Sequence, residues 1–253
     1  MHSASKAYRT HPPLALAVPY TVLAALVFAS VSLLTLLLIL PTPGLNLRRR
    51  IVRAGARAGL LLTGMRLDVR HAHRLPQGPC VVVANHASYI DGVLLKAALP
   101  ARFAFVIKRE MNDVPLAGLL LRRIGAEFVD RGKGQRGGRD ALRVLRTAAN
   151  GTSLAFFPEG TFEREPGLLR FHSGAFVAAV RNDYPVVPLV IHDARRALPP
   201  GLLWPWPTRV VVDVLEPLSA GTKPPEQAVI DLRREARARI LSQLGEPDLA
   251  PDL

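Results

Sequence analysis

The residues best suited to chemistry are a histidine and an aspartate five positions apart, His86 and Asp91. They follow a short apolar run at 80–84, which is typical of a buried strand. If all the residues between them were helical, the two side chains would face about 140° apart. They can meet if His86 ends the strand and Asp91 lies in the first turn of the next helix. The carboxylate would then fix the imidazole tautomer, leaving the other ring nitrogen as a base for a hydroxyl that attacks an acyl thioester.

Three further blocks follow, or lie in, candidate strands: 125–131, 157–161 and 186–189. The carboxyl ends of parallel strands share one edge of a sheet, where ligands bind. There the guanidinium of Arg131 could clamp a phosphate, beside a Glu-Gly turn and the histidine base. This combination would form an acyl-transfer site.

Each of these residues also has a simpler interpretation. Asp91 or Glu159 could cap a helix, Gly160 could only allow a turn, and Arg131 could lie on the surface of a basic loop. A serine hydrolase would also use a histidine and an aspartate. No Gly-x-Ser-x-Gly sequence occurs, so a serine nucleophile has no obvious position.

The elements that must position these residues alternate short β-rich runs with helical patterns. We predict strands at 80–84, 103–107, 127–129, 153–157, 186–191 and 210–215. We predict helices at 92–99, 116–124, 139–149 and 174–182, and a last amphipathic helix after Pro224 and Pro225. This order predicts an α/β fold with a mostly parallel sheet flanked by helices, preceded by an N-terminal hydrophobic helix.

The N-terminal segment carries no charged residue from 14 to 40. A spanning helix needs roughly 20 apolar residues, so this run is long enough to cross a membrane. The alternative is a segment that enters one leaflet and returns. Residues 45–62 mix basic and apolar side chains, as an interfacial helix does, although they could instead pack on the globular domain.

The net charge of +13 favours an anionic partner, and its distribution favours a membrane surface. Eight basic residues precede the first acidic one, Asp68, and flank the hydrophobic segment. Aromatic residues make up only 6% of the chain, which argues against a nucleic-acid surface. The arginines at 48–50 predict that the following domain is cytoplasmic.

We expect no metal site. The single cysteine, Cys80, excludes both an intramolecular disulfide and a cysteine-based zinc site. His71 and His73 have no acidic or cysteine partner at ligand spacing.

Taken in order, the blocks resemble the glycerolipid acyltransferases of the 1-acylglycerol-3-phosphate acyltransferase type. The resemblance covers about residues 68–215 and the hydrophobic N-terminus. It implies that His86 is the base and Asp91 its partner, that Arg131 binds the acceptor's phosphate, and that a Glu-Gly pair contacts the glycerol. The positions that it implies contact substrate are Lys108, Gly125, Arg131, Glu159, Gly160, Thr161 and Pro188.

Two positions depart from the pattern of many relatives. Phe162 stands where they have an arginine, and His172 stands where they often have a lysine. Both lie near the expected head-group end. They therefore bear on the identity of the acceptor more than on acyl transfer.

We therefore expect a lysophospholipid O-acyltransferase that converts 1-acylglycerol-3-phosphate to phosphatidic acid. Its cosubstrate would be acyl-CoA or acyl-carrier protein, with no other cofactor, and its partners would be membrane lipids. The alternatives are another acceptor, such as a lyso-ornithine lipid, or a non-catalytic lipid-binding relative. We expect a membrane-anchoring segment at 1–66, an acyltransferase domain at 67–245 and a disordered tail at 246–253, on the cytoplasmic face of the inner membrane.

Overall fold

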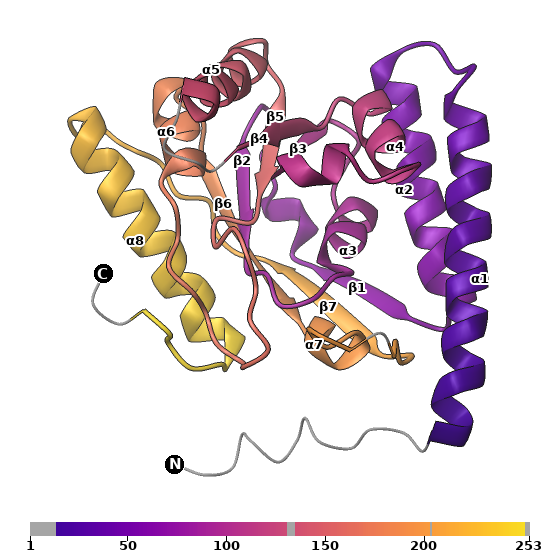
Figure 1. Ribbon diagram of the computed structural model, residues 1–253. Helices are drawn as coiled ribbons and strands as arrows, with labels where there is room; N and C mark the ends of the chain where they lie inside the picture. Colours follow the sequence, from indigo (N-terminus) through magenta and orange to yellow (C-terminus); the bar gives the residue numbers. More distant parts are fainter. Residues whose placement is uncertain (1–13, 131–134, 203, 251–253) are drawn as a thin grey trace.

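A seven-stranded sheet organises the computed structural model, which describes residues 14–130, 135–202 and 204–250 (Figure 1). The strands are β1 (Arg66–Arg70), β2 (Val81–Ala84), β3 (Phe103–Lys108), β4 (Glu127–Val129), β5 (Ser153–Phe156), β6 (Val186–His192) and β7 (Arg209–Val214). Their order across the sheet is β1-β7-β6-β2-β5-β3-β4, and neighbouring strands are parallel except β6 and β7. The predicted mostly parallel α/β sheet is confirmed.

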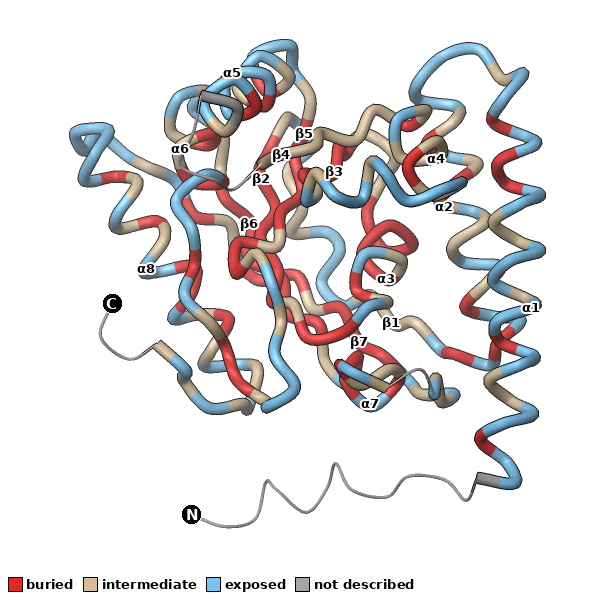
Figure 2. The backbone as a smooth tube through the Cα atoms, in the orientation of Figure 1, coloured by how far each residue is buried: buried red, intermediate tan, exposed pale blue. Residues whose placement is uncertain are grey.

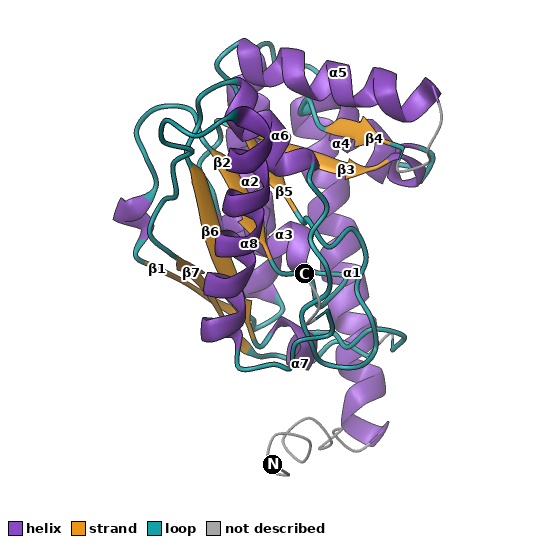
Figure 3. Cartoon of the chain, turned by 90° about the vertical axis from the view of Figure 1, so that its left-hand side faces the viewer, coloured by secondary structure: helices purple, strands orange, loops and turns teal. Residues whose placement is uncertain are grey.

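Helices cover both faces of this sheet (Figure 3). They are α1 (Leu14–Ile39), α2 (Leu45–Leu62), α3 (Asp91–Ala98), α4 (Ala117–Arg123), α5 (Gln135–Ala149), α6 (Gly174–Arg181), α7 (Ala194–Ala197) and α8 (Pro225–Leu244). Successive side chains of a strand point to opposite faces. In β2, Val82 and Ala84 therefore join a core with α3, whereas Val81 and Val83 join a second core with α6 and α8.

The predicted strands and helices all form, with ends that differ by a few residues, but β1 was missed. Its sequence, Arg-Leu-Asp-Val-Arg, carries three charged residues in five and has no apolar run. It forms because it lies at the edge of the sheet beside β7, where Asp68 pairs with Arg209 in solvent. The short helix α7 was also not predicted.

The N-terminal helices α1 and α2 form an antiparallel hairpin on one side of the sheet (Figure 1). By length and composition, α1 could cross a membrane over residues Ala15–Ile39. Much of its surface is exposed, in contrast to the buried sheet (Figure 2). Both ends of α1 nevertheless touch the domain: the Tyr20 ring packs against Trp206 with centroids 5.6 Å apart, and Arg123 donates to the carbonyl of Leu40, one residue beyond the helix.

Helix α2 packs on the domain, which was one of the two expected alternatives. Arg57 Nε donates to the carbonyl oxygen of Ala97 at 2.9 Å, and Arg53 donates to that of Ala98 at 3.3 Å. The side chain of Leu60 enters the core beneath α3. The segment before residue 66 is therefore joined to the globular domain by side-chain packing as well as by the chain.

The C-terminal residues 246–250 correct the expectation of a disordered tail. The Glu246 carboxylate accepts the Gly167 amide at 2.7 Å and lies 3.5 Å from Arg195. Asp248 pairs with Arg237 of α8 and forms a short β-bridge with Leu168. Ion pairs with largely buried arginines therefore fix a polar segment that hydrophobicity alone would leave unplaced.

Candidate active site

The His86 and Asp91 side chains meet at the carboxyl end of β2. His86 lies two residues beyond the strand and Asp91 is the first residue of α3, so the strand-to-helix turn brings them together as the spacing predicted. Nδ1 of His86 lies 2.7 Å from Oδ2 of Asp91. Because a carboxylate only accepts hydrogen bonds, Nδ1 carries the proton and Nε2 is the basic nitrogen.

Backbone amides hold the aspartate in this position. Asp91 is fully buried, and its Oδ2 also accepts the amides of Ala87 at 2.7 Å and Ser88 at 2.8 Å. Charge-assisted hydrogen bonds of this kind stabilise an ionised carboxylate in the interior. The carboxylate therefore organises the whole turn around the histidine.

Two polar side chains fasten the same turn to the rest of the sheet. The Asn85 amide bonds both the carbonyl oxygen and the amide of Ile191, at 3.1 and 2.7 Å. The Ser88 hydroxyl donates to the carbonyl oxygen of Leu198 at 2.7 Å. These bonds tie the end of β2 to β6 and to the segment after it.

Glu159 supports the histidine from behind. Its Oε1 accepts the His86 amide at 2.6 Å and its Oε2 accepts the Leu169 amide at 2.8 Å, while 3% of the residue is exposed. Burial raises the pKa of this carboxyl to about 7, against the opposing effect of the two amide bonds. Because both oxygens are occupied within the protein, a contact between Glu159 and the acceptor stays a prediction.

The rest of this block forms a tight turn. Gly160 has a φ of +79°, a conformation that favours glycine, and its amide bonds the Phe157 carbonyl at 3.1 Å. Thr161 follows on the exposed side of the turn. The turn carries Glu159 inward and leaves Thr161 facing solvent.

Aromatic rings enclose the imidazole, which sequence reasoning did not foresee. Phe157 stacks on the His86 ring with centroids 4.3 Å apart, and Phe162 meets it edge-on at 4.5 Å. Tyr89 packs against Phe162 at 4.9 Å and is itself exposed. The sequence identified Phe162 only as a departure from a familiar motif. The His86 side chain keeps 19% of its surface exposed, so it remains accessible beside apolar walls.

The remaining predicted residues lie in three different places. Lys108 ends β3, next to β5, so it belongs to the same edge of the sheet, where it pairs with Glu110 at 3.1 Å. Arg131 lies outside the described residues. Gly125 precedes β4 at the opposite edge, against Leu45 and Arg49 of α2. Pro188 is buried within β6, opposite Val83. The structure therefore does not bring Gly125 or Pro188 to the edge of the sheet where His86 and Asp91 meet.

In the described part of the chain, no three His, Cys, Asp or Glu side chains gather closely enough to hold a metal ion. The expectation of a reaction without a metal stays a prediction.

Comparison with known proteins gives consistent matches. A family model described as Acyltransferase matches residues 66–192. The chain is 38% identical over 136 residues to human 1-acyl-sn-glycerol-3-phosphate acyltransferase alpha, covering 51% of this chain and 47% of the relative. It is 32% identical over 204 residues to the mouse protein of that name, covering 74% of this chain and 68% of the relative.

A bacterial relative differs in its acceptor. The chain is 32% identical over 139 residues to the lyso-ornithine lipid O-acyltransferase of Pseudomonas aeruginosa, covering 55% of this chain and 53% of the relative. In several of these curated relatives, the match spans about half of the relative's length.

The fold also matches a solved structure. The crystal structure of the 1-acyl-sn-glycerophosphate acyltransferase of Thermotoga maritima superposes with a TM-score of 0.72 at 21% identity, covering 89% of this chain and 94% of that one. The region matched by the family model runs from β1 to β6 and contains His86, Asp91 and Glu159. The chain therefore belongs to the acyltransferase family.

Proposed function

We propose that the protein is a lysophospholipid O-acyltransferase that acylates 1-acylglycerol-3-phosphate to phosphatidic acid. The observation that carries the proposal is the 2.7 Å contact between His86 Nδ1 and Asp91 Oδ2, which leaves a basic Nε2 on a partly exposed imidazole. Relatives named 1-acyl-sn-glycerol-3-phosphate acyltransferase support this choice of acceptor.

The reaction needs one proton carrier. Nε2 of His86 takes the proton of the acceptor hydroxyl as its oxygen attacks the carbonyl carbon of the acyl thioester. A carbon–oxygen bond forms and the carbon–sulfur bond breaks. The leaving thiolate takes the proton back from the imidazolium, which Asp91 stabilises meanwhile. The donor would be acyl-CoA or acyl-carrier protein.

We assign binding of the acceptor to basic side chains. Lys108 ends the strand beside β5, and its partner Glu110 is exposed, so that ion pair is easily exchanged for a phosphate. We assign the acceptor's phosphate to Lys108 together with Arg131. Glu159 acts as a positioning residue, because its contacts are with the backbone on which His86 is mounted.

The N-terminal hairpin would hold the edge of the sheet that carries His86 close to the membrane, where the lipid substrate lies. Near the start of α1 the Tyr20 ring packs against Trp206, and just after its end the Leu40 carbonyl accepts a bond from Arg123. A helix that packs along α2 and is fastened to the domain near both of its ends supports a hairpin embedded in one leaflet rather than a separate span. We propose that it sits in the inner membrane, with the domain on the cytoplasmic face.

Labelling in intact cells tests this orientation. Glu226 is exposed at the start of α8, whereas the native Cys80 is buried. The variant Glu226→Cys should resist a membrane-impermeant maleimide until the inner membrane is opened. Labelling in cells whose inner membrane is intact would show that the domain lies on the opposite face.

The catalytic proposal is tested by acyl transfer in detergent. Purified wild type, His86→Ala and the surface control His73→Ala are assayed with lysophosphatidic acid and either acyl-CoA or acyl-carrier protein. Removing a general base typically lowers the rate by roughly 10² to 10⁴. We expect that loss for His86→Ala only. An active His86→Ala variant would exclude His86 as the base, and a folded wild type without product would exclude this acceptor.

A second acceptor is favoured by one observation. Phe162 packs on His86 at the position where many relatives have an arginine, and one relative acylates a lyso-ornithine lipid, according to its name. We therefore include lyso-ornithine lipid in the assay, with Phe162→Arg beside wild type. If wild type has a higher kcat/KM for lyso-ornithine lipid than for lysophosphatidic acid, and Phe162→Arg reverses this preference, then lyso-ornithine lipid is the acceptor.

A further inference from the structure

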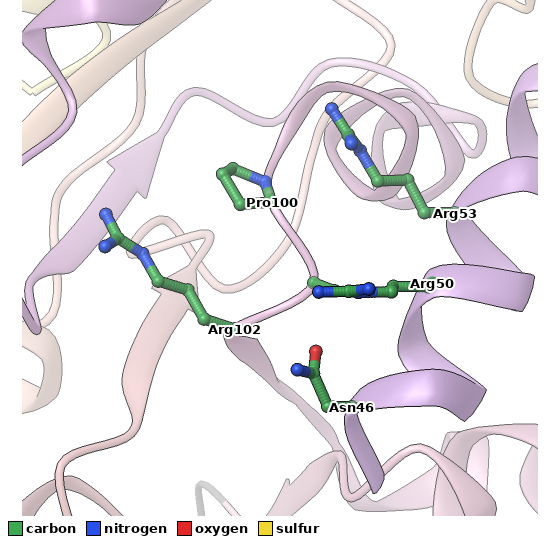
Figure 4. Close-up of a pocket in the computed structure, with 6 residues that line it drawn as sticks. Asn46, Arg50, Arg53, Pro100 and Arg102 are labelled. Atoms are coloured by element: carbon green, nitrogen blue, oxygen red, sulfur yellow. The ribbon is translucent and has the colours of Figure 1, made fainter. Parts of the chain in front are cut away.

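A cavity of about 470 Å³ lies between the first half of α2 and the turn that joins α3 to β3 (Figure 4). We call it the Arg50 pocket. Its volume is in the range of small-molecule sites. Its lining residues are Asn46, Arg50, Arg53, Pro100, Ala101 and Arg102.

The pocket lies far from the catalytic histidine. Helix α3 begins with Asp91, which holds His86, and the pocket lies beyond its other end, at Pro100. Eight helical residues span roughly 12 Å. The pocket also faces the start of β3, whereas the catalytic edge is formed by strand carboxyl ends. The two sites are therefore separate.

The lining contains three arginines and no acidic residue. Within the described residues, Arg50 makes no hydrogen bond or ion pair, and the buried Nε atoms of Arg53 and Arg102 have no partner. Leaving a buried donor unsatisfied costs about 1–3 kcal/mol, and more when the group is charged. The accessible group in the lining that lacks a counterion is the exposed guanidinium of Arg50, and an anion in the pocket would satisfy its donors.

The protein around the pocket adds positive charge. Lys96 of α3 is buried, and burial, followed by the charges of Arg49 and Arg53, lowers its pKa to about 8. Arg49 gains some favourable interaction from Glu127, but that carboxylate is already bonded by Arg143. The positive charge around the pocket is therefore only weakly compensated within the fold.

Two of the arginines are held in place before any ligand arrives. The Arg102 guanidinium donates to the carbonyl oxygens of Pro76 and Gln77, and Arg53 donates to that of Ala98. Each guanidinium has five N–H donors, so both retain donors after these bonds. A site built from fixed side chains loses less entropy when it binds its ligand.

A simpler explanation covers only part of the cluster. Arg53 and Arg57 bond the last carbonyl groups of α3, where cations are favourable. That role does not explain Arg50, which donates to no carbonyl group in the described part of the chain, nor the unused donors of Arg102.

We propose that the Arg50 pocket binds a phosphate group, at a site distinct from the one where the acceptor reacts. Guanidinium groups suit phosphate because their paired donors match its oxygens. The phosphate could belong to the head group of an anionic phospholipid or to a soluble molecule such as inorganic phosphate or CoA. The position on α2 favours the lipid, because α2 pairs with α1, whose exposed face is lined with leucines.

Binding is measured by calorimetry on the full chain in neutral detergent. The probes are dihexanoylphosphatidylglycerol, inorganic phosphate, CoA and, as the zwitterionic control, dihexanoylphosphatidylcholine. The test variant is Arg50→Glu, since Arg50 is exposed and has no partner to lose. The control is Arg57→Gln, at a cation of the same helix outside the pocket, whose Nε bonds the Ala97 carbonyl.

We expect phosphatidylglycerol to bind more tightly than phosphatidylcholine, and Arg50→Glu to weaken binding at least about tenfold, as loss of a charge-assisted hydrogen bond does. Arg57→Gln should weaken it less than about twofold, and acyl transfer by Arg50→Glu in neutral detergent without added phosphatidylglycerol should equal wild type. Arg50-sensitive binding of phosphate or CoA but not of the lipid would keep the phosphate site and change its source. If no probe's binding depends on Arg50, or if Arg57→Gln has an equal effect, the proposal is wrong.

Discussion

The two ends of α3 differ in how their charges are compensated. At the first end, the Asp91 carboxylate accepts two backbone amides and the His86 ring. At the other end, Arg50 has no partner among the described residues, and Arg53 and Arg102 retain unpaired donors. The same helix thus joins a site where the protein itself supplies three partners to one carboxylate oxygen, although the buried Oδ1 of Asp91 has none, to a site whose positive charges lack counterions.

The difference follows from what each end must do. A general base has to be held in one tautomer and one orientation before the substrate arrives, so its partners belong to the protein. A charged ligand supplies its own counter-charge, so a site for it is left with unpaired donors. A substitution that changes the charge pairing at one end of α3 should therefore leave the activity or binding at the other end unchanged.

The largest effect is expected for Asp91→Asn. Oδ2 accepts both the His86 ring and two backbone amides, so an asparagine either keeps its oxygen there and loses the charge that stabilises the imidazolium, or turns its NH₂ group there, breaks the amide bonds and favours the wrong tautomer. In a Ser-His-Asp triad this change costs about 10⁴ in kcat, and we expect about 10³ to 10⁴ here. Acyl-transfer kinetics measure it, and phosphatidylglycerol binding to the Arg50 pocket should be unchanged. A loss of both properties would show that the two ends are not independent.

A smaller effect is expected for Glu159→Gln. The glutamine oxygen can accept only one of the two amides, and its NH₂ group faces the other, so the backbone of His86 moves. Loss of one such bond costs about 1–3 kcal/mol, which corresponds to roughly fivefold to a hundredfold in kcat if it falls on the transition state. Because the effect acts through His86, KM should change little. A change in KM with unchanged kcat would instead indicate that Glu159 contacts the acceptor.

The same variant should alter the pH dependence of stability. The Glu159 carboxyl, with a pKa near 4.5 in the unfolded chain and about 7 in the fold, binds more protons when folded. Its contribution to stability therefore falls as pH rises from about 4.5 to 7, by up to roughly 3 kcal/mol. Denaturant unfolding at pH 5 and pH 8 should show this slope in wild type and lose it in Glu159→Gln. An equal slope in both would assign it to other groups.

Much of the catalytic end was predictable because its residues are close in sequence or follow strands. The β2 strand is continuously apolar, and the His86–Asp91 spacing requires a strand-to-helix turn, so the sequence already contained that geometry. The bonds of Glu159 were not predictable in the same way. They join the His86 amide to a carboxylate 73 residues away, and no local pattern specifies which amide a carboxylate will accept.

The basic end was less predictable. The sequence placed Arg50 and Arg53 in a positive stretch beside a hydrophobic segment. That interpretation gives the sign of their charge, but it does not say which residues they lie beside. The pocket depends on Arg102, which precedes β3 and carries no motif. A cavity formed by two segments about 50 residues apart is a property of tertiary packing, and hydrophobic periodicity does not report it.

The smallest effect is expected for Lys96→Met, which tests the charge imbalance at the basic end. Burial among arginines disfavours the charged form of Lys96, whose pKa is about 8 in the fold against 10.5 in the unfolded chain. Below pH 8 the charged form is therefore disfavoured in the fold, and wild-type stability should rise as pH increases from 8 to 10.5. Methionine removes this cost but also the contact of Nζ with the Phe105 ring, 5.3 Å from its centroid.

We expect Lys96→Met to stabilise the fold by about 1–2 kcal/mol at pH 7, because the shift of 10.5 − 8 in pKa corresponds to roughly 3 kcal/mol before the lost ring contact is subtracted. Denaturant unfolding with and without phosphatidylglycerol measures the gain. A bound anion would already stabilise the ammonium of wild type, so the gain should shrink in its presence, while kcat stays unchanged. A destabilised variant would mean that Lys96 is compensated within the protein, and the contrast between the two ends of α3 would then rest on Arg50 and Arg102 alone.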